Sequence, residues 1–130
     1  MTIFICLDDR GGIRFNGRRQ SRDIRVLEDM AARVTGELWI TPFSGKLFHM
    51  AGIPCHVMGD EPMTGEAIFL EEIPSEELLA QADTLTVYRW NRHYPADVRF
   101  DADLSSFTLQ RTENFPGSSH ETITKEVYAL

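Results

Sequence analysis

The sequence predicts an α/β fold, in which helices flank a mixed, mostly parallel sheet that ends in a C-terminal antiparallel strand pair. Short apolar runs alternate with helical patterns over the first two thirds of the chain, which is typical of parallel strands joined by crossover helices. Two segments near 107–111 and 121–129 then follow one another without a helical pattern between them, as in an antiparallel pair. With 130 residues and 42% hydrophobic content, the chain can bury one core, so a single domain over 1–130 is expected.

The N-terminal half is expected to begin with a strand buried on both faces, because the run TIFICL is apolar and rich in β-branched and aromatic residues. Glycine pairs and Asn-Gly then indicate a loop, and apolar residues at intervals of three and four indicate a helix. The expected elements are a strand at 2–7, a loop at 8–20, a helix capped by Ser21 and ended by Gly36, a strand at 37–41 and a short helix from Ser44 to Gly52.

The following segment is expected to continue the alternation. Its expected elements are strands at 53–58 and 66–70, a short helix capped by Ser75, and a strand at 85–90.

Charge is distributed unevenly along the chain. The net charge of −7 argues against generic nucleic-acid binding. Six arginines and one aspartate lie between residues 10 and 25, so this segment carries +5 and the other 114 residues carry −12. Because guanidinium groups present planar donors that match carboxylate and phosphate, this arginine-rich segment is suited to an anion, or else forms a solvated loop and helix face.

Two cysteines and the hydropathy pattern bear on location. Cys6 and Cys55 each lie within an apolar run, where a small hydrophobic side chain in a reducing compartment is expected. The chain contains no apolar stretch of 18 residues and no basic leader before Asp8, so neither a membrane span nor a signal peptide is expected. A cytoplasmic protein is predicted.

The residue types that carry chemistry form no recognisable catalytic or metal-binding motif in this sequence. The four histidines stand at no metal-ligand spacing, which argues against a metal hydrolase, and the chain contains no glycine-rich phosphate loop. Cys55 and His56 are neighbours in an expected strand, so their side chains point to opposite faces and cannot act as a nucleophile and base pair. Trp90, with arginines nearby, can stack a heterocycle or pack in the core.

Several segments together resemble dihydrofolate reductases over about two thirds of the chain. The first strand, the loop with Gly12-Ile13 and Asn16-Gly17, the helix, the strand LWIT and the helix from Ser44 follow the order of that family's N-terminal half. Residues 92–95, Arg-His-Tyr-Pro, look like the family's Thr-His-Phe-Pro segment, and Ser119-His120 looks like its Ser-His turn before the last strand. The resemblance implies a dihydrofolate reductase-like fold.

The catalytic acid of the family has no clear equivalent in this sequence. The resemblance implies a carboxylate early in the first helix, but an alignment without gaps puts Arg25 there, and Arg92 replaces the threonine that partners the acid. Asp23 or Glu28 could substitute only with a shifted helix register, and two residues rotate a side chain by about 200°. A competent dihydrofolate reductase is therefore not expected.

The cofactor side of the family pattern is also incomplete. The Gly-Gly loop that holds the pyrophosphate has no counterpart between the strand at 66–70 and the helix after Ser75, so one strand and helix unit is expected to be missing. Ser44 remains as a possible vestigial cofactor site. No cofactor is therefore expected, and NADPH binding is expected to be lost.

These observations predict a non-catalytic, dihydrofolate reductase-like binding protein with an arginine-lined cleft for an anionic small molecule or an acidic partner protein. Arg25 is expected at the floor of the cleft and Arg92 at its edge. The candidate ligand-binding residues are Arg18, Arg19, Arg22, Arg25, Trp90 and Arg92.

Two alternatives stay open at this point. One is a reductase of a non-folate substrate that uses NAD(P)H or a flavin in a rearranged site. The other is a small interaction protein of the immunity or antitoxin type, for which a compact acidic chain is typical.

Overall fold

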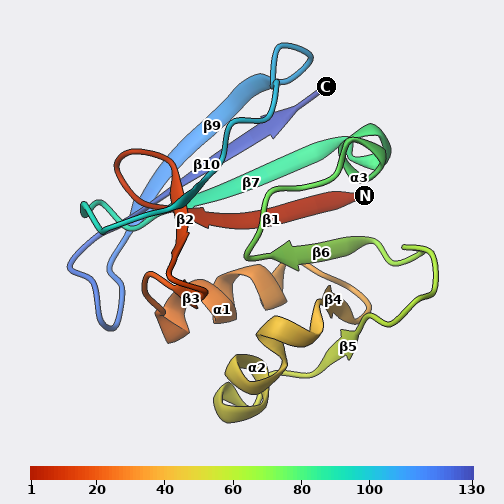
Figure 1. Cartoon of the computed structure of the whole chain (residues 1–130), viewed down its shortest axis with the longest axis horizontal. Coiled ribbons are helices and arrows are strands. Elements are labelled where there is room, and N and C mark those ends of the chain that lie inside the picture. Colours follow the sequence, from red (N-terminus) through yellow and green to blue (C-terminus); the bar gives the residue numbers. More distant parts are fainter.

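A computed structural model describes all 130 residues, which form a seven-stranded sheet, a small three-stranded sheet and three α-helices (Figure 1). The main sheet has the strand order β5-β4-β6-β1-β7-β10-β9. Its strands are β1 (Thr2–Leu7), β4 (Leu38–Ile40), β5 (Cys55–Val57), β6 (Ala67–Leu70), β7 (Thr84–Arg89), β9 (Thr108–Phe115) and β10 (Ile123–Ala129). The small sheet has the order β3-β2-β8 and contains β2 (Gly12–Phe15), β3 (Arg18–Arg19) and β8 (Val98–Arg99). The helices are α1 (Ile24–Ala32), α2 (Gly45–Ala51), which follows the 3-10 turn η1 (Pro42–Ser44), and α3 (Glu76–Gln81).

The strand directions confirm the predicted sheet. β1 lies at the centre and pairs in parallel with β6 and β7, and β4 pairs in parallel with β5 and β6. β10 pairs antiparallel with β7 and with β9, as the missing helical pattern near the C-terminus predicts. The parallel strands need crossover connections, and α1, α2 and α3 provide them.

Both faces of the main sheet are buried, because side chains of a strand alternate between faces. On one face Phe4 packs with Leu27 and Met30 of α1 and with Phe48 of α2. On the other face Ile3, Ile5 and Leu7 pack with other buried residues, and the α3 leucines and the segment 98–107 cover them. The continuous apolar run of β1 therefore reflects burial on two sides. None of the helices combines the length and the apolar character that crossing a bilayer requires.

The segment 8–20, predicted as an irregular loop, instead contains a hairpin of β2 and β3. Asn16 and Gly17 form its turn with φ of 54° and 72°, the left-handed region that these two residue types tolerate. β2 also pairs with β8, a strand that the sequence did not predict. Strands of two to four residues are too short to show an alternating pattern, so only the turn was recognisable.

The predicted first helix is present, but its start differs by two residues. Asp23, and not Ser21, is the N-cap residue, and its carboxylate accepts a hydrogen bond from the Arg25 backbone N–H. The helix ends at Ala32 with Arg33 as C-cap, before the predicted terminator Gly36. This placement fixes which helical residues face the sheet and which face solvent.

Candidate functional site

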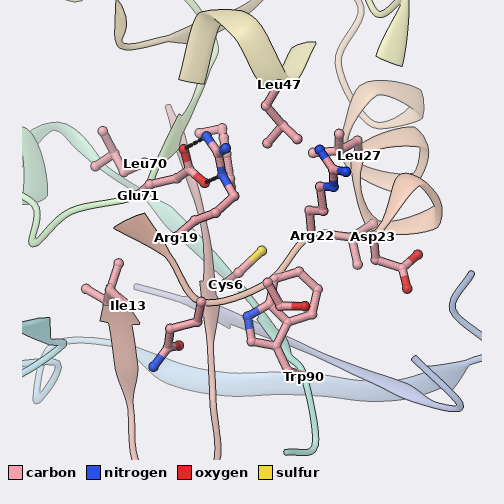
Figure 2. A pocket seen from close by; sticks show the side chains of 14 residues that line it. Cys6, Ile13, Arg19, Arg22, Asp23, Leu27, Leu47, Leu70, Glu71 and Trp90 are labelled. Carbon is pink, nitrogen blue, oxygen red and sulfur yellow. Dashed lines mark hydrogen bonds and ion pairs between the residues drawn. The ribbon is translucent and has the colours of Figure 1, made fainter. Parts of the chain in front are cut away.

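A small cavity lies where the carboxyl ends of β1, β6 and β7 meet the first turn of α1 (Figure 2). Its walls include Cys6, Leu70, Glu71 and Trp90 from the strand ends, Val26 and Leu27 from α1, and Leu47 from α2. Arg19 of β3 and residues 20–23, between β3 and α1, also line it. The carboxyl ends of parallel strands are where ligands of open α/β sheets commonly bind, so this cavity is the candidate site.

One wall of the cavity is an ion pair between Arg19 and Glu71. Arg19 Nε and Nη2 lie 2.7 and 2.9 Å from the two oxygens of the Glu71 carboxylate, and Figure 2 shows this bidentate contact. Ser44 Oγ donates to the same carboxylate at 2.8 Å. The Glu71 hydrogen bond raises the pKa of Arg19, against the opposing effect of burial. Ser44, the residue predicted as a vestigial cofactor contact, is therefore bound to Glu71.

A basic groove continues from the mouth of the cavity. We use this name for the surface formed by Gly17, Arg18, Arg19, Ser21, Arg22, Phe43, Lys46 and Ser119. Phe43 is 38% exposed, and the guanidinium groups of Arg14 and Arg19 lie 5.1 and 5.2 Å from its ring centre. Arg18, Arg22 and Lys46 form no ion pair within the chain, so their charges face the groove without compensation.

Asp23 ties α1 to the turn at 117–120, which lies almost a hundred residues away in sequence. Both carboxylate oxygens accept from the Ser118 N–H at 2.9 Å, and Oδ2 also accepts from the Ser119 N–H at 2.9 Å. His120 Nδ1 lies 3.0 Å from Oδ2. Burial alone would raise the pKa of Asp23, but these hydrogen bonds lower it to about 2. Figure 2 shows the carboxylate turned away from the centre of the cavity.

Gly117 allows this close contact. A Cβ at this position would lie 2.5 Å from Asp23 Oδ2 and 2.7 Å from the His120 carbonyl oxygen. A larger residue would therefore force the turn off the carboxylate.

The stability of the folded chain should fall in acid as Asp23 is protonated. Its pKa is about 2 in the folded chain against an ordinary value of 3.8, so its ionised form stabilises the fold above about pH 4. This contribution, roughly 2 kcal/mol in full, is lost as the pH falls toward 2. Urea unfolding at pH 6 and at pH 3 should show about half of this loss, because the folded carboxylate is protonated only near pH 2. The Asp23→Asn variant should show a smaller pH dependence than the wild type, whereas Asp101→Asn, at an exposed position, should match the wild type.

Cys6 forms part of the cavity wall as a protonated thiol. Burial raises its pKa well above the ordinary value, and the nearby charges of Glu71 and Asp23 raise it further. The side chain therefore acts as a small apolar surface within the cavity, in agreement with its position in an apolar run.

The structure brings together four of the six predicted ligand-binding residues. Arg19, Arg22 and Trp90 line the cavity, and Arg18 lines the basic groove. The expected positions of Arg25 at the floor and Arg92 at the edge of the cleft need correction. Both side chains are exposed, and they line neither the cavity nor the basic groove.

The misplacement of these two arginines has a geometric cause. Val26, Leu27 and Met30 form the buried stripe of α1, so Arg25 points outward by the helical rotation of 100° per residue. Arg92 lies in the loop after β7, where its carbonyl accepts from the Asp9 N–H.

The segment before β7 contains the two expected elements, and no further strand or helix lies between them. β6, a loop and α3 follow one another there, and they carry the chain across β1 to β7. The strand end carries Glu71 and Glu72 where the family resemblance implied Gly-Gly. Sequence reasoning missed Glu71, although a polar residue directly after a buried strand marks the carboxyl edge of a parallel sheet.

No protein-family model matches the sequence, and no curated protein matches it. A solved structure does: a dihydrofolate reductase from Enterococcus faecalis in complex with NADP(H) and RAB-propyl. The similarity has a TM-score of 0.70 at 13% sequence identity, and covers 98% of this chain and 94% of that chain. It confirms the dihydrofolate reductase-like fold that the sequence predicted.

The same neighbour contradicts the expectation that the chain uses no cofactor. The enterococcal protein holds NADP(H) on a fold that superposes with nearly the whole of this chain. The expectation rested on the absence of a Gly-Gly loop between β6 and α3, and this absence leaves the fold unchanged.

Proposed function

We propose that this chain binds a phosphorylated nucleotide, with NADP(H) as the first candidate. The proposal rests on the dihydrofolate reductase-like fold and on the basic groove onto which its cavity opens. The observation that supports the proposal is the set of uncompensated cations in the basic groove: Arg18, Arg22 and Lys46. Arginine forks match phosphate oxygens in pairs, and lysine adds a point charge. A chain with a net charge of −7 holds a phosphate ligand only where its positive groups gather, as they do here.

The residues present fit both parts of such a ligand. Arg18, Arg22 and Lys46 would hold phosphate groups along the groove, and the exposed ring of Phe43, which lines the same groove, offers a surface for stacking. Trp90 and Leu27 give the small adjoining cavity an apolar wall. When bound, a reduced nicotinamide supplies a hydride.

The carboxylates at the cavity support binding over reduction of folates. Both oxygens of Asp23 accept hydrogen bonds from the 118–120 turn, and its pKa of about 2 keeps it ionised at neutral pH. Both oxygens of Glu71 are held by Arg19 and one also by Ser44. Neither carboxyl group is therefore a ready proton donor to a substrate ring in the cavity.

Arg22→Ala should weaken the binding of NADPH by about 10- to 100-fold. Hydrogen bonds to charged groups contribute about 1.5–3 kcal/mol each, and 1.4 kcal/mol corresponds to a factor of ten in affinity. Isothermal titration calorimetry at low salt measures the dissociation constant for NADPH, NADP+ and ATP. The control is Arg25→Ala, which removes an equal charge from a residue that lines neither the cavity nor the basic groove. This variant should bind NADPH with the affinity of the wild type.

Two results would contradict the proposal. One is the absence of binding by all three nucleotides at millimolar concentration. The other is an equal loss of affinity in Arg22→Ala and Arg25→Ala, which would show that only the overall charge matters. Oxidation of NADPH followed at the same time would separate the reductase alternative from simple binding.

A further inference from the structure

Ser21, His120 and Asp23 form a hydrogen-bonded chain beside the cavity. Ser21 Oγ lies 2.9 Å from His120 Nε2, and His120 Nδ1 lies 3.0 Å from Asp23 Oδ2. A hydroxyl, an imidazole and a carboxylate in this order and at these distances match the arrangement of a nucleophile, a base and the group that orients the base. The three residues lie at 21, 23 and 120, so no local motif in the sequence indicates them.

The surroundings fix the direction of each hydrogen bond. Asp23 is ionised, so it can only accept, and His120 therefore donates its Nδ1–H to Oδ2. In the tautomer with its proton on Nδ1, the ring has a lone pair on Nε2, which accepts from the Ser21 hydroxyl. Trp90 stacks on the imidazole ring with centroids 4.5 Å apart, and the Tyr94 hydroxyl lies 3.2 Å from Nε2. These contacts hold the ring in place.

The burial of the three groups differs in the way that a nucleophilic site requires. Asp23 is 2% exposed and His120 is 4% exposed, so solvent does not separate them. Ser21 is only partly buried, and it lines both the cavity and the basic groove. A substrate in the basic groove can therefore reach the hydroxyl without any movement of the pair behind it.

We propose that Ser21 is the nucleophile of an acyl-transfer centre that hydrolyses a carboxylic ester bearing an anionic group. Ser21 Oγ forms a bond to the carbonyl carbon while its proton passes to His120 Nε2. The tetrahedral intermediate then breaks the ester C–O bond, and the proton on Nε2 goes to the leaving alcohol. A water molecule next attacks the acyl-serine carbon and gives a proton to Nε2. That proton returns to Ser21 Oγ as the carboxylic acid leaves.

The ester class follows from the groups around Ser21. Arg22 follows Ser21 directly and lines the same cavity, so a negative charge near the scissile carbonyl would meet a guanidinium. The Arg22 backbone N–H has no acceptor within the chain, and the amide after a serine nucleophile is a usual donor to the oxyanion. This activity goes beyond nucleotide binding and does not depend on it.

The test is covalent labelling by a fluorophosphonate probe, which carries no nucleotide. The expected result is one adduct on the folded wild type, with fluoride released, and peptide mapping should place it on Ser21. Ser21→Ala should lose the adduct and at least 90% of p-nitrophenyl acetate hydrolysis. Ser106→Ala, at an exposed serine that makes no hydrogen bond and lies outside the site, should keep both.

The mapping keeps the result clear if Ser21→Ala folds poorly, because it uses the wild-type protein. An adduct on another serine, the absence of any adduct, or equal labelling in a folded Ser21→Ala variant would overturn the proposal. Thermal melting of each variant establishes which of them are folded.

Discussion

Replacing Asp23 by alanine is expected to lower the free energy of unfolding by about 3 to 5 kcal/mol, because it removes a buried charge that several groups share. The carboxylate caps α1 through the Arg25 N–H, and the loss of an N-cap alone costs about 1 kcal/mol. It also accepts from the backbone N–H groups of Ser118 and Ser119 and from the His120 ring. Each buried donor left without an acceptor costs about 1 to 3 kcal/mol.

Urea unfolding at pH 7 measures this effect against two matched variants. Asp23→Asn keeps an acceptor and the cap but loses the charge, so its loss should be smaller than that of Asp23→Ala. Glu28→Ala lies on the exposed side of the same helix and should change stability by less than about 0.5 kcal/mol. A loss below about 1 kcal/mol in Asp23→Ala would show that the 117–120 turn is held by other contacts.

The sequence predicted the main sheet well because its signals are local. The strand at 2–7 matches β1 residue for residue, because the apolar run coincides with the strand and stops at Asp8. The helix after Ser75 matches α3, where the Ser75 hydroxyl accepts from the Leu78 N–H as a cap should. β2, β3 and β8 were not predicted as strands, because each has only two to four residues and the pairing of β2 with β8 is a long-range contact.

The helix start shows where local reasoning ends. Ser21 and Asp23 are both good N-cap residues, and the spacing of apolar residues does not choose between them. The 118–120 turn makes the choice. Its backbone N–H groups donate to the Asp23 carboxylate, and its His120 side chain is hydrogen-bonded to the Ser21 hydroxyl. A contact that spans almost a hundred residues leaves no trace in the helical pattern.

The candidate site was predicted in part for the same reason. Arg18, Arg19 and Arg22 were found because they lie close together in one segment. Arg25 was placed by an alignment without gaps, whose register the helix does not follow, and Arg92 by the likeness of residues 92–95 to a family segment. The Arg19–Glu71 pair joins residues 52 positions apart, so neither partner indicates the other in the sequence.

Asp29→Ala should destabilise the chain by about 3 to 5 kcal/mol, because Asp29 neutralises a buried lysine. Lys125 Nζ lies 2.7 Å from Asp29 Oδ2, and the Lys125 side chain is only 2% exposed. The Tyr88 hydroxyl donates to the same oxygen at 2.6 Å. Burial alone would raise the pKa of Asp29, but the Lys125 and Tyr88 contacts lower it, so the carboxylate is charged in the folded chain. Alanine would leave an ammonium group and a hydroxyl buried with only the more distant Glu113, 3.5 Å from Nζ.

The double variant Asp29→Leu/Lys125→Met separates the charge effect from the loss of packing. Breaking a buried ion pair is costly because one charge remains, whereas replacing both partners by apolar residues of similar size is often neutral or stabilising. In urea unfolding, the double variant should therefore be more stable than Asp29→Ala, although it changes two buried positions. Glu113→Gln, at the partly exposed second partner, should cost less than about 1 kcal/mol. If Asp29→Ala and the double variant lose the same stability, packing of the side chains, and not the buried charge of Lys125, holds α1 to β10.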